Sequence, residues 1–127
     1  MGVSGCGKST VAVGIAHALG WPFAEADDVH PPRNVAAMRS GRPLSDDDRW
    51  PWLADLAGWI AAQDAHGRSS VMACSALRRS HRDVLRTGAP GVAFIHLDGP
   101  ADLVAARVAA RTGHFMPVSL LQSQVAT

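Results

Sequence analysis

The chain has 127 residues, which is enough for one domain built around one hydrophobic core. Its formal net charge is only +1, so the chain lacks the basic field of a nucleic-acid-binding protein or of one held on an anionic membrane. No apolar run approaches membrane-spanning length, and the N-terminus lacks a secretory pattern. Cys6 and Cys74 form neither a disulfide framework nor a zinc-site spacing. We therefore expect a cytoplasmic protein with no nucleic-acid and no membrane partner.

Helical segments alternate with short apolar runs along the chain. A first helix is expected over 7–19, because Val11, Ile15 and Leu19 share one helical face and Gly20 follows as a stop signal. Ser45, followed by three aspartates, predicts the capped start of a longer helix that ends at Gly67. The other expected elements are strands over 22–26, 71–74 and 92–97 and helices over 33–39, 77–85, 101–111 and 118–125. Strands that alternate with helices indicate an α/β fold with a parallel sheet.

Residues 2–9, Gly-Val-Ser-Gly-Cys-Gly-Lys-Ser, match the phosphate-binding pattern G-x-x-x-x-G-K-[ST]. Glycines let the backbone wrap closely around a phosphate, and the following helix presents its positive N-terminus to the same anion. Lys8, the one lysine of the chain, is expected to bridge the β- and γ-phosphates of ATP, and Ser9 to bind Mg²⁺. A chance glycine-rich turn is the alternative, since only Met1 stands where a buried strand should precede the loop. The expected nucleotide-binding residues are Gly2, Val3, Ser4, Gly5, Cys6, Gly7, Lys8, Ser9 and Thr10.

Further stretches, in order along almost the whole chain, resemble the gluconokinase family of P-loop kinases, which is related to shikimate and nucleoside-monophosphate kinases. They are Asp27-Asp28-Val29-His30-Pro31, Asn34, Met38, Gly41, Pro43-Leu44, Asp46-Asp47-Asp48-Arg49, Pro51-Trp52-Leu53, Cys74-Ser75-Ala76-Leu77, Arg82-Asp83 and Arg111-Thr112-Gly113-His114-Phe115. The resemblance implies a P-loop kinase fold, a parallel sheet flanked by helices. It also implies phosphorylation of the sugar acid D-gluconate on its 6-hydroxyl by ATP with Mg²⁺, and it leaves a homodimer open.

The resemblance further implies that residues 1–127 form a single, incomplete kinase domain. Met1 corresponds to a position late in the family's first strand, and residues 122–124 stop short of its last strand and helix. We therefore expect this chain by itself to fold poorly and to have little kinase activity. Ala26 and Ala37 depart from the family's glycine and lysine; the first is expected to crowd the substrate floor, the second to remove a surface charge.

Asp27 follows a predicted strand, at the edge where ligands gather in open α/β sheets. It is expected to accept the proton of the attacking hydroxyl or to orient that hydroxyl and Mg²⁺; an Asx-turn residue is the alternative. Arg49 and Arg82 are candidates for the substrate carboxylate, because a guanidinium pairs with it in bidentate fashion. His30 either shapes the substrate loop or caps a turn. Helix capping is favoured for Asp46 and Asp47, and a solvated helix face for Arg78, Arg79 and Arg86.

The segment 107–118 resembles the family's lid. Arg107 and Arg111 are four residues apart, which predicts one helix face, and the resemblance implies that they neutralise charge on the transferred phosphoryl group. His114 is a further substrate candidate, and the alternative for the arginines is a basic helix end.

Three other functions stay open from the sequence. The chain could be another small-molecule kinase of the same fold, of the shikimate or nucleotide type. It could be a nucleotide-binding switch, or a truncated remnant without catalytic activity.

Overall fold

In the computed structural model the described residues are 1–111, 123–124 and 126–127. The elements are α1 (Lys8–Leu19), β1 (Phe23–Glu25), the 3₁₀ turn η1 (Ala26–Val29), α2 (Pro32–Arg39), α3 (Asp46–Ala65), β2 (Val71–Ala73), α4 (Arg79–Arg86) and α5 (Ala101–Ala110). β1 and β2 pair in parallel, with Phe23 opposite Val71 and Glu25 opposite Ala73. The predicted α/β class is confirmed, and most expected elements appear within a few residues of their predicted bounds.

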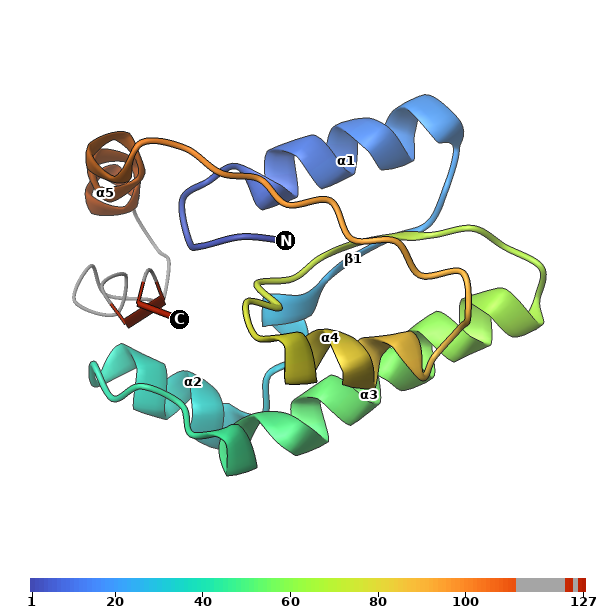
Figure 1. The fold of residues 1–127 in the computed structure, drawn as a ribbon, viewed down its shortest axis with the longest axis horizontal. Helices are drawn as coiled ribbons and strands as arrows, with labels where there is room; N and C mark the ends of the chain where they lie inside the picture. Colours follow the sequence, from blue (N-terminus) through green and yellow to red (C-terminus); the bar gives the residue numbers. More distant parts are fainter. Residues whose placement is uncertain (112–122, 125) are drawn as a thin grey trace.

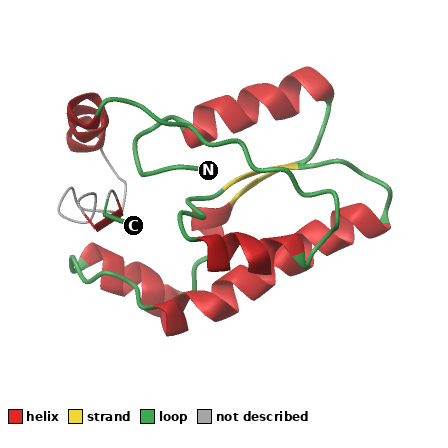
Figure 2. Cartoon of the chain, in the orientation of Figure 1, coloured by secondary structure: helices red, strands yellow, loops and turns green. Residues whose placement is uncertain are grey.

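Helices cover both faces of the β1–β2 pair. Figure 1 shows α1 on one side of the strands and α3 with α4 on the other, and Figure 2 shows the same three layers coloured by secondary structure. The loop before α1 lies between the strands and α5, so the carboxyl ends of both strands and the start of α1 open toward the same region. Convergence of these ends is the arrangement in which parallel α/β sheets bind their ligands.

The main core lies between the strands and α3. Leu53 and Leu56 of α3 are almost wholly buried, and Trp52 beside them donates its indole N–H to the carbonyl of Ala26 at 2.8 Å. Ala26 is itself completely buried in this core cluster. It does not line the cavity beside the glycine-rich loop, so the expectation that its methyl group crowds the substrate floor is wrong. Ala37 is also buried, with Met38 and Leu44, so it does not stand at a surface position.

The expected strand over 92–97 is wrong. This segment is extended, and in the described part of the chain its only backbone bonds to the rest of the sheet region run to Met1, through Ile95 O and Leu97 N. Gly2 N donates to Ser75 O at 3.2 Å, so Met1 and Gly2 join the two segments at one end. Between residues 71–73 and 92–94 lies a cavity of about 630 Å³, which we call the β2 cavity. The apolar run is present, but it has no strand beside it with which to form a ladder.

The helix expected over 118–125 falls mostly outside the described residues. Among the helices that the structure does describe, none is long and apolar enough to cross a membrane.

Candidate active site

A cavity of about 320 Å³ lies where the glycine-rich loop, the end of β1 and the start of α3 meet; we call it the phosphate-loop cavity. Its volume is within the range of small-molecule sites, about 300–1,000 Å³. The side chains around it include a lysine, arginines, carboxylates and hydroxyls that come from distant parts of the sequence. Its lining residues are Ser4, Gly5, Lys8, Ser9, Glu25, Asp27, Asp28, His30, Met38, Leu44, Arg49, Trp52, Ser75, Arg111 and Gln124.

The loop from Gly2 to Gly7 adopts a conformation that depends on its glycines. Gly7 caps α1 with φ of 95°, a left-handed value that other residues rarely adopt. Gly5 has φ of 82°, and a Cβ there would lie 2.7 Å from Val108 Cγ2 of α5. Val104 and Val108 of α5 are buried, with Val3 of the loop packed against them. The loop is therefore held between α1 and α5, and only glycine fits at the point of closest approach.

Lys8 and Ser9 point from the first turn of α1 into the cavity. Lys8 Nζ donates to the carbonyl of Val3 at 2.9 Å, so the ammonium lies across the loop. Ser9 Oγ donates to a carboxylate oxygen of Glu25, the last residue of β1. Burial raises the pKa of Glu25, and the bond from Ser9 opposes that rise. Thr10, also predicted to bind nucleotide, is exposed and does not line this cavity.

Asp27 lies in the 3₁₀ turn directly after β1, at the edge predicted for it. His30 Nε2 is 3.9 Å from Asp27 Oδ1, and the His30 ring stacks on Trp52 with ring centroids 4.0 Å apart. The Asn34 amide nitrogen donates to Asp48 O at 2.9 Å and lies 3.4 Å from His30 Nδ1. Since that nitrogen can only donate, it favours the neutral His30 tautomer with its proton on Nε2, facing Asp27. Burial lowers the pKa of His30, which also favours the neutral ring.

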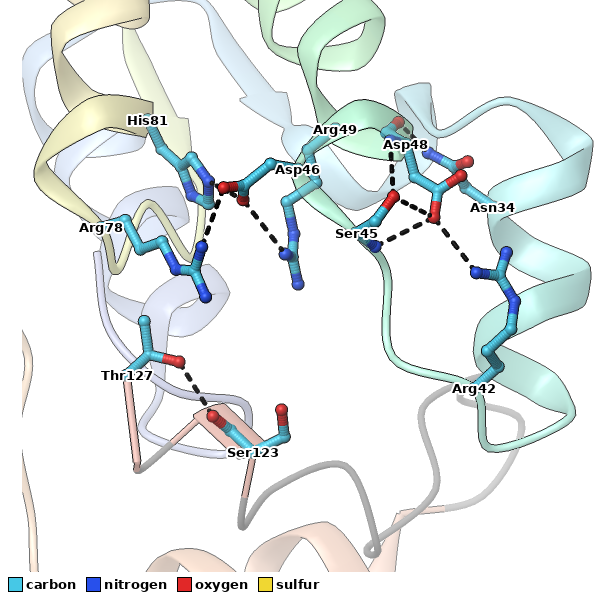
Figure 3. A network of polar contacts seen from close by, with 10 residues as sticks. All are labelled: Asn34, Arg42, Ser45, Asp46, Asp48, Arg49, Arg78, His81, Ser123 and Thr127. Carbon is cyan, nitrogen blue, oxygen red and sulfur yellow. Dashed lines mark hydrogen bonds and ion pairs between the residues drawn. The ribbon is translucent and has the colours of Figure 1, made fainter.

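Arg49 reaches the same cavity from α3. Its Nη1 lies 3.8 Å from Asp46 Oδ1, while Asp46 also accepts hydrogen bonds from Arg78 at 2.9 Å and from His81 at 3.2 Å (Figure 3). Arg78 is exposed, as the sequence predicted, and it also pairs with Asp46 of α3. Asp46 and Asp47 lie in the first turn of α3, where acids were expected, and the capping box itself is formed by Ser45 with Asp48.

Arg82, the other candidate for a substrate carboxylate, lies elsewhere. Its Nη1 donates to the carbonyls of Ala76 at 2.9 Å and Leu77 at 2.7 Å. Ala76 has φ of 42°, the one positive φ among the described non-glycine residues, so Arg82 stabilises a strained turn after β2. Arg82 is not among the residues that line the phosphate-loop cavity.

The predicted lid is only partly within the described residues, and His114 lies outside them. Arg111 lines the phosphate-loop cavity, whereas Arg107 is an exposed residue of α5 that does not line it. α5 ends at Ala110 and Arg111 has an extended backbone, so the two arginines do not share a helix face as the spacing predicted. Of the pair, Arg111 is the one that the structure brings to the site.

The oxygen atoms around Ser9 suit a magnesium ion. Magnesium prefers hydroxyl and carboxylate oxygens and is usually held by one or two protein groups plus phosphates and water. Ser9, Glu25 and Asp27 supply such oxygens to one cavity. The described residues contain no group of three or more His, Cys, Asp or Glu side chains that could hold a metal ion by themselves.

Two contacts of the loop were not predicted from the sequence. Glu25 is the last residue of β1. Its place near the carboxyl end of a predicted strand, where ligands gather in open α/β sheets, could have singled it out. Gln124 accepts a hydrogen bond from the backbone N–H of Ser4 at 2.7 Å, across 120 residues of sequence. No local pattern in the sequence predicts such a distant contact.

Comparison with known proteins gives consistent results. The gluconokinase of Gluconobacter oxydans (strain 621H) is 51% identical over 127 residues, an alignment that covers all of this chain and 71% of that protein. The thermoresistant gluconokinase of Escherichia coli (strain K12) is 46% identical over 127 residues, covering all of this chain and 73% of the relative. No protein-family model matches the chain.

Two solved structures also resemble this chain. An unliganded sugar kinase from Janibacter sp. HTCC2649 superposes with a TM-score of 0.94 at 57% identity, over all of this chain and 73% of that one. A gluconokinase from Sinorhizobium meliloti 1021 superposes with a TM-score of 0.86 at 53% identity, over 99% of this chain and 70% of the other.

Proposed function

This chain belongs to the gluconokinase family, and we propose that it transfers the γ-phosphate of ATP to the 6-hydroxyl of D-gluconate. The observation that carries the proposal is the phosphate-loop cavity, where Lys8 and Ser9 of the loop share one space with Asp27 and Arg49. Such a site has a place for a phosphate chain at one end and for a hydroxylated acid at the other. Most of the catalytic effect in phosphoryl transfer comes from positioning and electrostatic stabilisation.

At the nucleotide end, the ammonium of Lys8 is the charge that stabilises the transferred phosphoryl group. It already lies across the loop at the Val3 carbonyl, at the start of α1, where the helix dipole also favours an anion. Arg111 lines the same cavity and is the lid arginine that we assign to the same charge. Magnesium, when bound with ATP, would supply positive charge that neutralises the phosphates; Ser9 would hold it, with Glu25 beside Ser9.

At the acceptor end, Asp27 takes the proton of the 6-hydroxyl. The hydroxyl oxygen forms a bond to the γ-phosphorus while the bond from that phosphorus to the β-phosphate oxygen breaks, and its electron pair leaves with ADP. The His30 ring stacks on Trp52 and its Nε2 faces Asp27, so His30 helps to hold the Asp27 carboxylate in place. The transfer requires no covalent intermediate on the protein.

The carboxylate of the acceptor is assigned to Arg49. Of the two candidate arginines, Arg49 lines the cavity, while the guanidinium of Arg82 is engaged by the Ala76 and Leu77 carbonyls. A charge-assisted bidentate bond is worth roughly 1.5–3 kcal/mol, or about ten- to a hundredfold in an equilibrium constant. D-gluconate should therefore be a better acceptor than glucose by about that factor in kcat/KM.

The test is an acceptor panel: D-gluconate, glucose, shikimate and a nucleoside monophosphate, each with ATP and Mg²⁺, with product formation measured directly. Selective turnover of D-gluconate is the expected result. Equal turnover of glucose and gluconate would remove the sugar-acid assignment, and preference for shikimate or a nucleotide would replace it. A cytoplasmic location, a homodimer and roles for Arg107 and His114 stay predictions from the sequence.

A further inference from the structure

Three consecutive aspartates begin α3, and the structure gives each a different environment. Asp48 accepts from Ser45 N and Ser45 Oγ, both at 2.9 Å, and pairs with Arg42 at 3.2 Å, so its charge is used by the helix cap. Asp47 is exposed and makes no ion pair or side-chain hydrogen bond among the described residues. The Asp46 side chain reaches across to α4, where it binds Arg78 and His81 (Figure 3).

Around Asp46, two guanidinium groups face one carboxylate. Arg78 Nη1 lies 2.9 Å from Asp46 Oδ2, and Arg49 Nη1 lies 3.8 Å from Asp46 Oδ1. The hydrogen bond from His81, with the charges of Arg78 and Arg49, holds the pKa of Asp46 below its usual value, so this carboxylate is ionised near neutral pH. Asp46 therefore links Arg49, a residue of the phosphate-loop cavity, to Arg78 and His81 at the start of α4.

The buried side chain of His81 holds Asp46 in place. His81 is 5% exposed, and its Nε2 donates to Asp46 from inside the contact between α3 and α4. Burial lowers the pKa of His81, so the ring is a neutral donor that orients Asp46 and adds no charge of its own. Arg49 is 27% exposed and lines the phosphate-loop cavity, so its guanidinium keeps donors accessible to a ligand there.

We propose that Asp46 is a positioning residue for acceptor binding: anchored by Arg78 and His81 at α4, it holds Arg49 so that this guanidinium faces the carboxylate of the sugar acid. Arg49 lines the cavity, whereas Arg78 binds Asp46 from the other side and does not line it (Figure 3). Asp46 itself touches no reacting group. This inference rests on the proposed function, because it concerns the binding partner of that substrate's carboxylate.

The test uses matched pairs of variants in the full chain. Asp46→Asn and Asp47→Asn remove the same charge from the same helical turn, but only the first loses ion pairs. Arg78→Gln and Arg79→Gln remove neighbouring cations, and Arg79 has only a 4.0 Å contact with Asp83. We expect Asp46→Asn and Arg78→Gln to raise KM for D-gluconate by about fivefold, the order expected for a partly exposed ion pair. KM for ATP, kcat and turnover of glucose should stay unchanged, as should every constant of both control variants.

A double-mutant cycle separates positioning from a general structural effect. If Asp46 acts by holding Arg49, with Arg78 as its anchor, Asp46→Asn should add little to the KM of a variant that already carries Arg49→Gln and Arg78→Gln. A merely structural role would raise KM for ATP as well. That outcome, or an unchanged KM for D-gluconate in Asp46→Asn, would overturn the inference.

Calorimetric binding of D-gluconate without ATP distinguishes failure of this inference from failure of the proposed function. If the wild-type protein phosphorylates D-gluconate and Asp46→Asn leaves the binding of D-gluconate unchanged, the inference alone is wrong. Binding that needs the carboxylate and weakens in Asp46→Asn, without turnover, supports the inference while the proposed function fails. A wild-type protein that neither binds nor phosphorylates D-gluconate removes both.

Discussion

The phosphate-loop cavity and the β2 cavity are both lined by residues of α1, and Lys8 borders both. The smaller is surrounded by polar side chains that already have partners: Lys8 with the loop, Ser9 with Glu25, Arg49 with Asp46. The larger is lined mostly by aliphatic and aromatic side chains of α1, β2 and residues 92–97. Side chains held by hydrogen bonds and ion pairs are arranged to bind something specific. Apolar walls without filling atoms instead mark a place where packing is incomplete.

The largest expected effect is a loss of catalytic rate in the polar phosphate-loop cavity. Lys8→Ala should lower kcat by on the order of a thousandfold, because removal of one positioned group that stabilises transition-state charge costs that much. The melting temperature should stay unchanged, since the Lys8 ammonium bonds only to its own loop. Steady-state kinetics and thermal unfolding measure both. More than a few per cent residual activity would contradict the assignment of the loop.

The packing difference is tested by two apolar truncations. Leu53 is completely buried in the core, whereas Val11 of α1 borders the β2 cavity and is 41% exposed. Leu53→Ala should lower the free energy of unfolding by about 3 kcal/mol, as large-to-small changes in packed cores do. Val11→Ala should cost less than about 1 kcal/mol. Chemical denaturation compares them, and equal losses would show that the β2 cavity is as well packed as the core.

The third effect is confined to one atom of the polar cavity. Asp27→Asn keeps the size of the side chain but removes its ability to take a proton. It should lower kcat by about a hundredfold, the lower part of the range for general-base catalysis, and leave the binding of ATP almost unchanged. Nucleotide titration beside the kinetics checks this. Lost ATP affinity with an unchanged kcat would make Asp27 a metal-binding or structural residue instead.

The β2 cavity also bears on the expectation that this chain folds poorly by itself. In the described residues, no backbone hydrogen bond joins 71–73 to 92–94 across that space. Unpaired strand edges and apolar walls without packing partners both reduce stability. The expectation itself stays a prediction, which a thermal scan of the isolated chain would test.

Local sequence determined much of what the structure shows. The glycine-rich loop could be read directly, because a left-handed cap such as Gly7 and a contact as close as that of Gly5 require glycine. The start of α3 followed from Ser45 and the acids after it, and Asp27 was placed by its position after a strand. These features depend on neighbours a few residues away, so their physical causes are visible in the sequence.

Tertiary structure decided which polar side chains share a site. Arg49 and Arg82 looked equivalent in the sequence, yet one lines the phosphate-loop cavity and the other stabilises the turn at Ala76. Asp46 lies in the first turn of α3 as expected, but its pairing with Arg78 across 32 residues was not predicted. The apolar run 92–97 had the composition of a strand, but a strand forms only where a second backbone lies beside it to complete the ladder. Pairings between distant segments are set by how the helices pack, which no local pattern records.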